Sequence, residues 1–119
     1  MTLKDKKICF LGDSITEGVG VSCVENRYTD VFKKITDVGE IKNYGISATR
    51  IAKQHNGSIY GEFVDKNSFC ERYNEMDDDA DIVVVFGGTN DYGHGDAPFG
   101  TKNDKKISKS DYCIYYSFA

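Results

Sequence analysis

The run from Asp81 to Gly88 (DIVVVFGG) constrains the fold of this chain more than any other feature. Five consecutive apolar residues, three of them valine, stand between an aspartate and two glycines. A strand with one solvated face alternates apolar and polar residues, whereas a strand covered on both faces is apolar throughout. This run therefore predicts a buried strand of the parallel type. Lys7 to Leu11 (KICFL), followed by Gly12, has the same character over a shorter length.

The segment between these runs predicts a helix and a weaker strand. Apolar residues recur at helical spacing on one face (Val24, Tyr28, Val31, Phe32 and Ile35). Ser22 is the expected N-cap of this helix, with Glu25 as its capping-box partner. A strand is expected at 41–44, a turn at 45–48 and one or two helical turns at 49–55.

The later part of the chain predicts a loop at 56–65 and a helix around Phe69, Tyr73 and Met76. The acidic run Asp77 to Asp79 is interpreted as a solvated connection without functional weight. Strands that alternate with helices are typical of a parallel α/β sheet with right-handed crossovers. The fold class expected from the sequence is therefore α/β.

Composition excludes several classes of partner. Fifteen Lys and Arg stand against 19 Asp and Glu, a net charge of -4, which favours neither nucleic acid nor an anionic membrane as partner. The apolar run at residues 8–11 is too short for a secretory signal or a membrane span. The four cysteines form no CxxC pair, so we expect reduced thiols, no structural metal and no cofactor in a soluble, cytoplasmic protein.

Three loops that follow strands carry residue types suited to acyl transfer. After the first strand, GDSITEG presents Ser14 with its hydroxyl exposed and its N–H toward a developing oxyanion. After the second, Gly45 permits close approach of a backbone N–H. After the third, Asn90 in GGTNDYGHG can donate from its side-chain amide. Each loop alone also fits an ordinary turn, and no GxGxxG or GxxxxGK[ST] phosphate loop is present.

The order GDSIT, NYGIS and GGTND resembles the SGNH hydrolases, also called GDSL esterases, from about residue 8 to about residue 100. The resemblance implies a flavodoxin-like three-layer α/β/α sandwich, a serine esterase activity on a small-molecule ester, and Ser14 as nucleophile. The implied oxyanion hole consists of the Ser14 N–H, the Gly45 N–H and the Asn90 side chain. Residues 1–100 would form an incomplete domain of about three strands, and residues 101–119 a divergent tail, polar and then aromatic.

The resemblance implies the strand order second, first, third, which leaves the strand at 82–86 on an edge. Such an apolar edge strand is a template for pairing with another chain. We therefore expect a homodimer through this edge, unless the segment Tyr112 to Phe118 covers it.

The departure from the family pattern concerns the base. In SGNH hydrolases the catalytic His and its orienting acid come from an Asp-x-x-His motif near the C-terminus of the domain, and we expect no such motif in this chain. Activity is therefore expected to be impaired, with His94 as a possible substitute base and His55 exposed. Asp13 and Thr89 are expected beside the substrate, Asp13 also bracing its turn. Arg50 is expected at the surface, where it could also contact a substrate carboxylate.

Two other functions stay open at this point. One is a non-catalytic module that binds a small ligand at Ser14, Gly45 and Asn90. The other is a nucleotide or flavin binder, in which Tyr44 or Tyr92 would stack on a ring.

Overall fold

The structure is a computed structural model that describes residues 2–57 and 59–97. It divides into two compact units. The first contains the described residues up to Ser47 together with Asn74–Phe86, and the second contains Ala48–Tyr73 together with the described residues from Gly87 on. The expected tail at 101–119, Cys113 included, lies outside the described residues.

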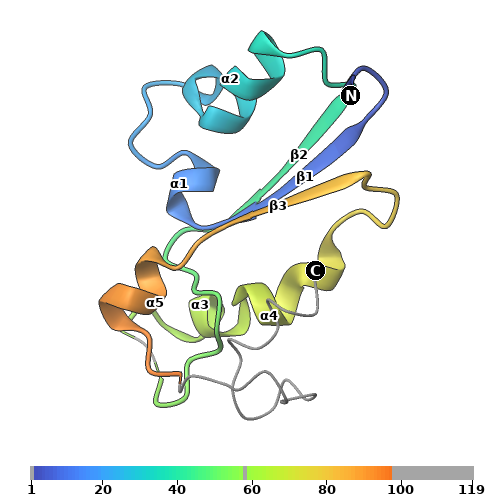
Figure 1. The fold of residues 1–119 in the computed structure, drawn as a ribbon. Coiled ribbons are helices and arrows are strands. Elements are labelled where there is room, and N and C mark those ends of the chain that lie inside the picture. The colour runs from blue at the N-terminus through green and yellow to red at the C-terminus, as the bar shows by residue number, and fades with distance from the viewer. Residues whose placement is uncertain (1, 58, 98–119) are drawn as a thin grey trace. The chain divides into compact units, whose positions relative to one another are not determined.

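A three-stranded parallel sheet forms the centre of the first unit (Figure 1). Its strands are β1 (Lys7–Gly12), β2 (Glu40–Gly45) and β3 (Ile82–Phe86), in the order β2-β1-β3. The register pairs Ile8 with Ile41 on one side and with Ile82 on the other. The predicted α/β class, parallel pairing and central first strand are confirmed. Because β1 has a neighbour on each side, its apolar residues are buried, as an uninterrupted apolar run requires.

Three helical segments accompany this sheet: α1 (Ser14–Glu17), the 3-10 helix Val24–Asn26 and α2 (Tyr28–Ile35). The rings of Tyr28 and Phe32 each meet the ring of Phe10 edge to face, with centroids 5.8 Å apart. These rings extend the core of Ile8, Phe10 and Val38. The core of this unit therefore lies between β1 and α2.

The predicted helix at 24–35 is interrupted, and Ser22 is not its N-cap. Arg27 is extended, and its N–H closes the 3-10 turn on the Val24 carbonyl. The Ser22 hydroxyl oxygen instead accepts a hydrogen bond of 2.8 Å from the Asn26 amide. Ile35, the last residue of α2, was expected on the apolar face but is 74% exposed.

The second unit contains α3 (Glu62–Lys66), α4 (Phe69–Arg72) and α5 (Thr89–His94), and the 3-10 helix Tyr73–Glu75 follows α4 directly. Three expectations were wrong here. The loop at 56–65 contains α3, the single helix at 69–76 is two short helices, and residues 49–55 are not helical. In that last segment the backbone N–H groups of Ile51, Ala52 and His55 donate to aspartate side chains rather than along a helix.

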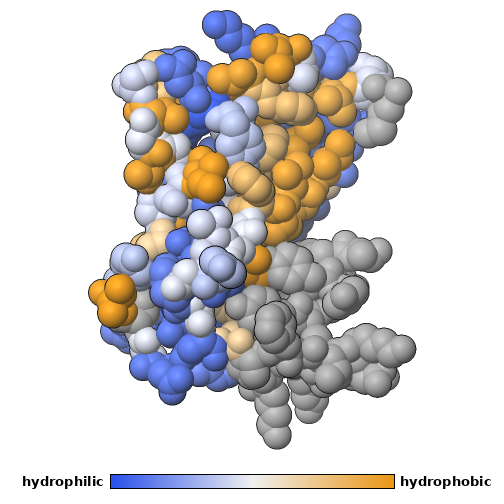
Figure 2. All heavy atoms as spheres, turned by 60° about the vertical axis from the view of Figure 1, so that its left-hand side comes forward, coloured by the Kyte–Doolittle hydropathy of each residue, from blue (hydrophilic) through white to orange (hydrophobic). Residues whose placement is uncertain are grey.

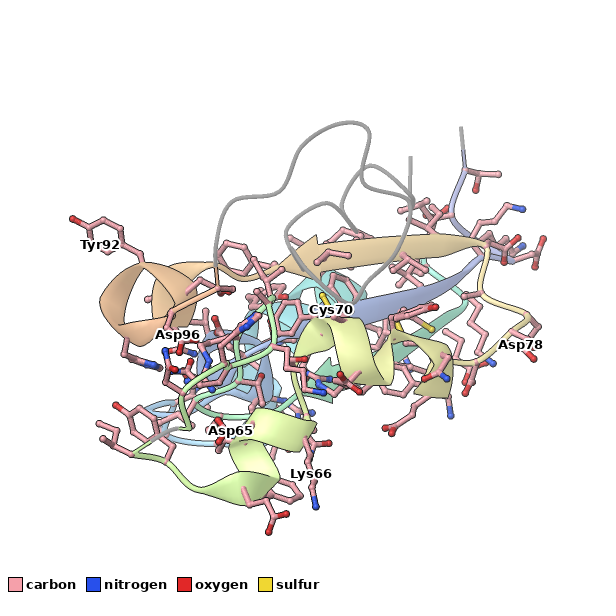
Figure 3. All side chains as sticks on the ribbon, turned by 90° about the horizontal axis from the view of Figure 1, so that it is seen from below. Asp65, Lys66, Cys70, Asp78, Tyr92 and Asp96 are labelled. Carbon is pink, nitrogen blue, oxygen red and sulfur yellow. The ribbon has the colours of Figure 1, made fainter. Side chains whose placement is uncertain are left out.

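The acidic residues before β3 fasten that segment to the start of β1. Lys7 Nζ lies 2.5 Å from Asp77 and 2.7 Å from Asp79, and the Lys7 N–H donates to Asp81. Asp77 also accepts a hydrogen bond of 2.7 Å from the Tyr44 hydroxyl. The run is therefore solvated at Asp78 and Asp79, as expected, but Asp77 and Asp79 also form ion pairs with Lys7 (Asp78 is labelled in Figure 3).

β3 lies at the edge of the sheet within the described part of the chain, where only β1 pairs with it. The prediction of a buried strand is wrong here, because Val83 and Phe86 are 42% and 49% exposed and no residue of β3 is fully buried. Hydrophobic residues also reach the surface on the face shown in Figure 2. Dimerisation through the β3 edge stays a prediction. Among the described residues, no helix is long and apolar enough to cross a membrane.

Acidification is expected to destabilise the first unit through Asp77. The hydrogen bonds from Lys7 and then from Tyr44 hold the pKa of the Asp77 carboxyl below its ordinary value of 3.8. The unfolded chain therefore takes up the proton first, so this stabilisation is complete above the unfolded pKa and is lost as pH falls through the folded one. Urea midpoints measured from about pH 5 to about pH 2 should fall less steeply for Asp77→Asn than for the wild type.

The exposed Asp78, changed to Asn, is the matched control and should keep the wild-type slope. Equal slopes for the wild type and Asp77→Asn would contradict the assigned pairing.

Candidate active site

Ser14 is the first residue of α1, and only Asp13 separates it from the end of β1. A Cβ at Gly12 would lie 1.9 Å from Thr16 Oγ1, so only glycine fits beneath the helix. Asp13 caps α1, because its carboxylate accepts the Ile15 N–H at 3.0 Å. The Ser14 N–H, one of the unpaired donors of a helix start, donates to no other described residue. The turn therefore presents both the hydroxyl and the N–H of a half-buried serine.

Asp13 was expected beside the substrate and as the brace of its turn. It is only 1% exposed, and its carboxylate is occupied by the Ile15 N–H. The bracing contact is therefore present, whereas a direct contact with substrate stays a prediction.

Gly45 ends β2 and lies against α1, the helix that Ser14 opens. A Cβ at Gly45 would lie 2.1 Å from the Glu17 nitrogen, so this approach needs a glycine. The Gly45 N–H, however, donates to the Asn43 side-chain oxygen at 2.9 Å. It could reach an oxyanion only if this hydrogen were shared or if the Asn43 side chain rotated.

Glu17 is a site residue that sequence reasoning did not single out. Its carboxylate accepts hydrogen bonds from both the N–H and the hydroxyl of Ser47. The turn after β2 is thereby tied to the end of α1. The available signal was the position of Glu17 inside the GDSITEG loop, three residues after the serine.

Ala48, directly after that turn, is the one non-glycine residue with positive φ (63°) in the described part of the chain. The left-handed conformation costs an L-residue about 1–2 kcal/mol, because Cβ approaches the following carbonyl oxygen. Such strain persists only where the surrounding contacts hold it. In this sequence, the alanine gave no sign of a left-handed turn.

Asn90 lies in the first turn of α5, after Thr89, which is exposed. Its side-chain nitrogen donates to the Thr49 carbonyl at 2.8 Å. An amide NH₂ carries two hydrogens. The Thr49 carbonyl therefore orients the amide and leaves one hydrogen for another acceptor.

Two aspartates beside Asn90 hold the segment at 49–56 by its backbone. Asp91, which is buried, accepts the Ile51 and Ala52 N–H groups at 2.9 and 3.0 Å. Asp96 accepts the N–H groups of His55 and Asn56 in the same way. Desolvation alone would raise the pKa of Asp96, but these hydrogen bonds lower it below its ordinary value.

Arg50 is buried, which corrects the expectation of a surface residue. Its side chain is 2% exposed, and its Nη2 lies 2.6 Å from Asp65 Oδ1 on α3 (Figure 3). Its Nη1 lies 3.1 Å from Nδ1 of His94. The Tyr60 ring lies against the His94 imidazole, with centroids 4.8 Å apart. His55 is exposed, and so is Tyr92, which points away from α5 (Figure 3).

Asp91 and His94 stand at the spacing Asp-x-x-His, a signal that sequence reasoning passed over because it lies inside the Asn90 loop. In an esterase triad the acid would bond to the histidine. Here both carboxylate oxygens of Asp91 are bound to backbone N–H groups, and His94 Nδ1 faces Arg50. Asp91 and His94 therefore have the Asp-x-x-His spacing but not the hydrogen bond between acid and histidine that a triad needs.

The first unit thus brings Ser14 and Gly45 together, and the second brings Thr89, Asn90 and His94 together. The joint geometry of all five stays a prediction. Among the described residues, no group of His, Cys, Asp or Glu is arranged to hold a metal ion.

Comparisons with known proteins bear on the family and the fold of the chain. The family model of the GDSL-like lipases/acylhydrolases matches residues 10–112. A solved crystal structure is similar, with a TM-score of 0.71 and 29% identity over 92% of this chain and 47% of its own. A structural-genomics crystal structure from Lactobacillus plantarum has a TM-score of 0.62 and 36% identity over 89% and 44%. The chain thus spans less than half of either protein. No curated protein matches it.

Replacing Asp91 is expected to release the backbone of residues 51 and 52. Each buried N–H left without an acceptor costs about 1–3 kcal/mol, and about 1.4 kcal/mol is a factor of ten. Asp91→Asn keeps one acceptor and loses the other, so hydrogen exchange of the Ile51 or Ala52 amide should accelerate by roughly tenfold or more. The amides of His55 and Asn56, which Asp96 holds, serve as internal controls. Unchanged exchange at both 51 and 52 would refute the assignment.

Ala48→Gly is expected to be neutral or to stabilise the fold by up to about 1 kcal/mol, because relief of left-handed strain outweighs the added entropy of the unfolded chain. Ala48→Val, with a β-branched residue at positive φ, should destabilise it by more than about 1 kcal/mol. Urea unfolding measures both changes. Ala80→Gly, at ordinary φ, is the control and should destabilise by about 0.4–1 kcal/mol. Equal effects of glycine at positions 48 and 80 would count against the strain.

Proposed function

The chain belongs to the GDSL-like lipase/acylhydrolase family, and we propose that it acts on small acyl esters with Ser14 as the nucleophile. The observation that carries the proposal is the presentation of Ser14 at the first turn of α1, directly after the central strand. In the reaction, Ser14 Oγ bonds to the acyl carbon and the ester C–O bond breaks. The serine proton passes through a base to the leaving alcohol, and water later releases the acyl group.

Hydrogen-bond donors aimed at the developing oxyanion would provide most of the stabilisation of the transition state. The Ser14 N–H and the second hydrogen of the Asn90 amide are the two donors that the described contacts leave available. The Gly45 N–H is the third proposed donor and shares its hydrogen with Asn43. We therefore expect Gly45 to contribute least of the three.

No residue is assigned as the general base of the proposed mechanism. A serine hydroxyl is a poor nucleophile at neutral pH without one. The first unit contains no histidine, because His55 and His94 both belong to the second. Near Ser14, the Asp13 carboxylate is bound to the Ile15 N–H and that of Glu17 to Ser47. We therefore propose that ester hydrolysis by this chain is slow.

A non-catalytic binding module is the second proposal, and the same observation favours it. Donors suited to an anionic or acyl ligand are present, while a base is not assigned. A ligand present at 100 times its dissociation constant would stabilise the fold by about 2.7 kcal/mol. Stabilisation by acetate without ester turnover would favour this second function, and stabilisation by FMN would favour a flavin binder.

Ser14 is expected to be the single residue that an activated organophosphonate modifies. General-base catalysis contributes about 10²–10⁴-fold, so labelling should be slow but should approach one adduct per chain. Intact-mass spectrometry measures the adduct, and Ser14→Ala should abolish it. Ser22→Ala, which removes an exposed serine outside the site, should label like the wild type.

An adduct that persists in Ser14→Ala would refute the assigned nucleophile. Rapid ester turnover that Ser14→Ala abolishes would refute the slow reaction.

A further inference from the structure

The contact between Arg50 and His94 determines which imidazole nitrogen carries the hydrogen. Arg50 Nη1 lies 3.1 Å from His94 Nδ1. A guanidinium has five N–H donors and no acceptor, and it stays protonated in proteins. Nδ1 must therefore accept through its lone pair. The neutral ring then carries its hydrogen on Nε2.

The Arg50 guanidinium that donates to His94 is fixed by a second contact. Its side chain is 2% exposed, and Nη2 is paired with Asp65 at 2.6 Å. The Tyr60 ring lies against the imidazole. The groups known to face His94 are therefore one cation and one aromatic ring, with the Asp65 carboxylate beyond the cation. The contact at Nδ1 itself is with the cation, which has no acceptor.

This arrangement is the reverse of a serine hydrolase triad. In a triad a carboxylate holds the hydrogen on Nδ1, so the Nε2 lone pair can take the serine proton. In this chain the one available lone pair faces Arg50. We propose that His94 donates a hydrogen bond through Nε2–H rather than acting as the substitute base, and that Arg50 is the positioning residue that sets this tautomer.

α5 places this donor beside Asn90. Residues 90 and 94 are four apart and so lie on one face of the helix. Their side chains also contact adjoining residues. The Asn90 amide donates to the Thr49 carbonyl, and the His94 ring contacts the Arg50 guanidinium. In the described part of the chain, nothing accepts a hydrogen bond from His94 Nε2. The inference that Nε2–H donates to an ester oxygen rests on the proposed function, whereas the assignment of the tautomer does not.

Nitrogen NMR of the ¹⁵N-labelled full chain tests the tautomer directly. Long-range ¹H–¹⁵N spectra distinguish a protonated ring nitrogen from an unprotonated one, and His94→Gln assigns the His94 signals against those of His55. Above neutral pH we expect Nε2 protonated and Nδ1 unprotonated in the folded chain, and a mixture in urea. A hydrogen on Nδ1 of folded His94, or the same mixture as in urea, would overturn the proposal.

Variants of Arg50 test its positioning role. Arg50→Lys keeps a donor and should keep the tautomer. The double variant Arg50→Met with Asp65→Asn removes the donor without leaving an unpaired carboxylate, and its His94 signals should move toward the mixture seen in urea. An unchanged tautomer in the folded double variant would refute the role of Arg50. If that variant does not fold, the wild-type spectrum still decides the tautomer.

The role of His94 is tested by the rate of organophosphonate labelling at Ser14. Glutamine at position 94 can donate a hydrogen bond but cannot act as a base, so His94→Gln should label faster than His94→Ala. If both variants label a hundredfold or more slowly than the wild type and at equal rates, His94 acts as a base, and the proposal that it donates a hydrogen bond is wrong. If both variants label at the wild-type rate, His94 has no role in the reaction with the ester. Absence of labelling in the wild type would defeat the proposed nucleophile while leaving the tautomer result intact.

Discussion

The side-chain amide of Asn43 joins three separate segments at the carboxyl end of β2. Its nitrogen donates to the Thr16 carbonyl at 2.6 Å and to the Thr29 hydroxyl at 2.9 Å, while its oxygen accepts the Gly45 N–H. The end of α1, the start of α2 and the turn after β2 therefore share one side chain. Asn43 is half-buried, and loss of its side chain would leave the partners in all three segments without this contact. The position of Ser14 depends on this contact through α1.

The strands could be predicted from the sequence because their signal is local. The apolar runs of β1 and β3 are uninterrupted, which predicted both strands, although burial on both faces followed for β1 and not for β3. The segment at 49–55 could not be predicted in the same way. Its backbone donors are taken by Asp91 and Asp96, about 40 residues further along the chain. No pattern within the segment records an acceptor that another part of the chain supplies.

The candidate site shows the same division between residues and their partners. The positions of Ser14, Gly45 and Asn90 after their strands could be predicted, because loops at the carboxyl ends of parallel strands gather at one edge. The hydrogen bonds of these residues could not. Nothing in NYGIS shows that Asn43 occupies the Gly45 N–H, and nothing in DYGH shows that Asp91 turns to the backbone while His94 faces Arg50. Arg50 itself was expected at the surface, because a single arginine in a polar sequence carries no sign of its burial.

The hydrogen bonds from the backbone of the segment at 49–56 to Asp91 and Asp96 have an evolutionary consequence. Both carboxylates bind backbone N–H groups, which every amino acid except proline supplies. The path of the chain at His55 and Asn56 is therefore held through their backbone N–H groups, whatever side chains stand there. The two aspartates carry the constraint for the whole segment. A surface beside the candidate site can in this way acquire new chemistry by single substitutions, with proline as the one residue that the hydrogen-bonded positions refuse.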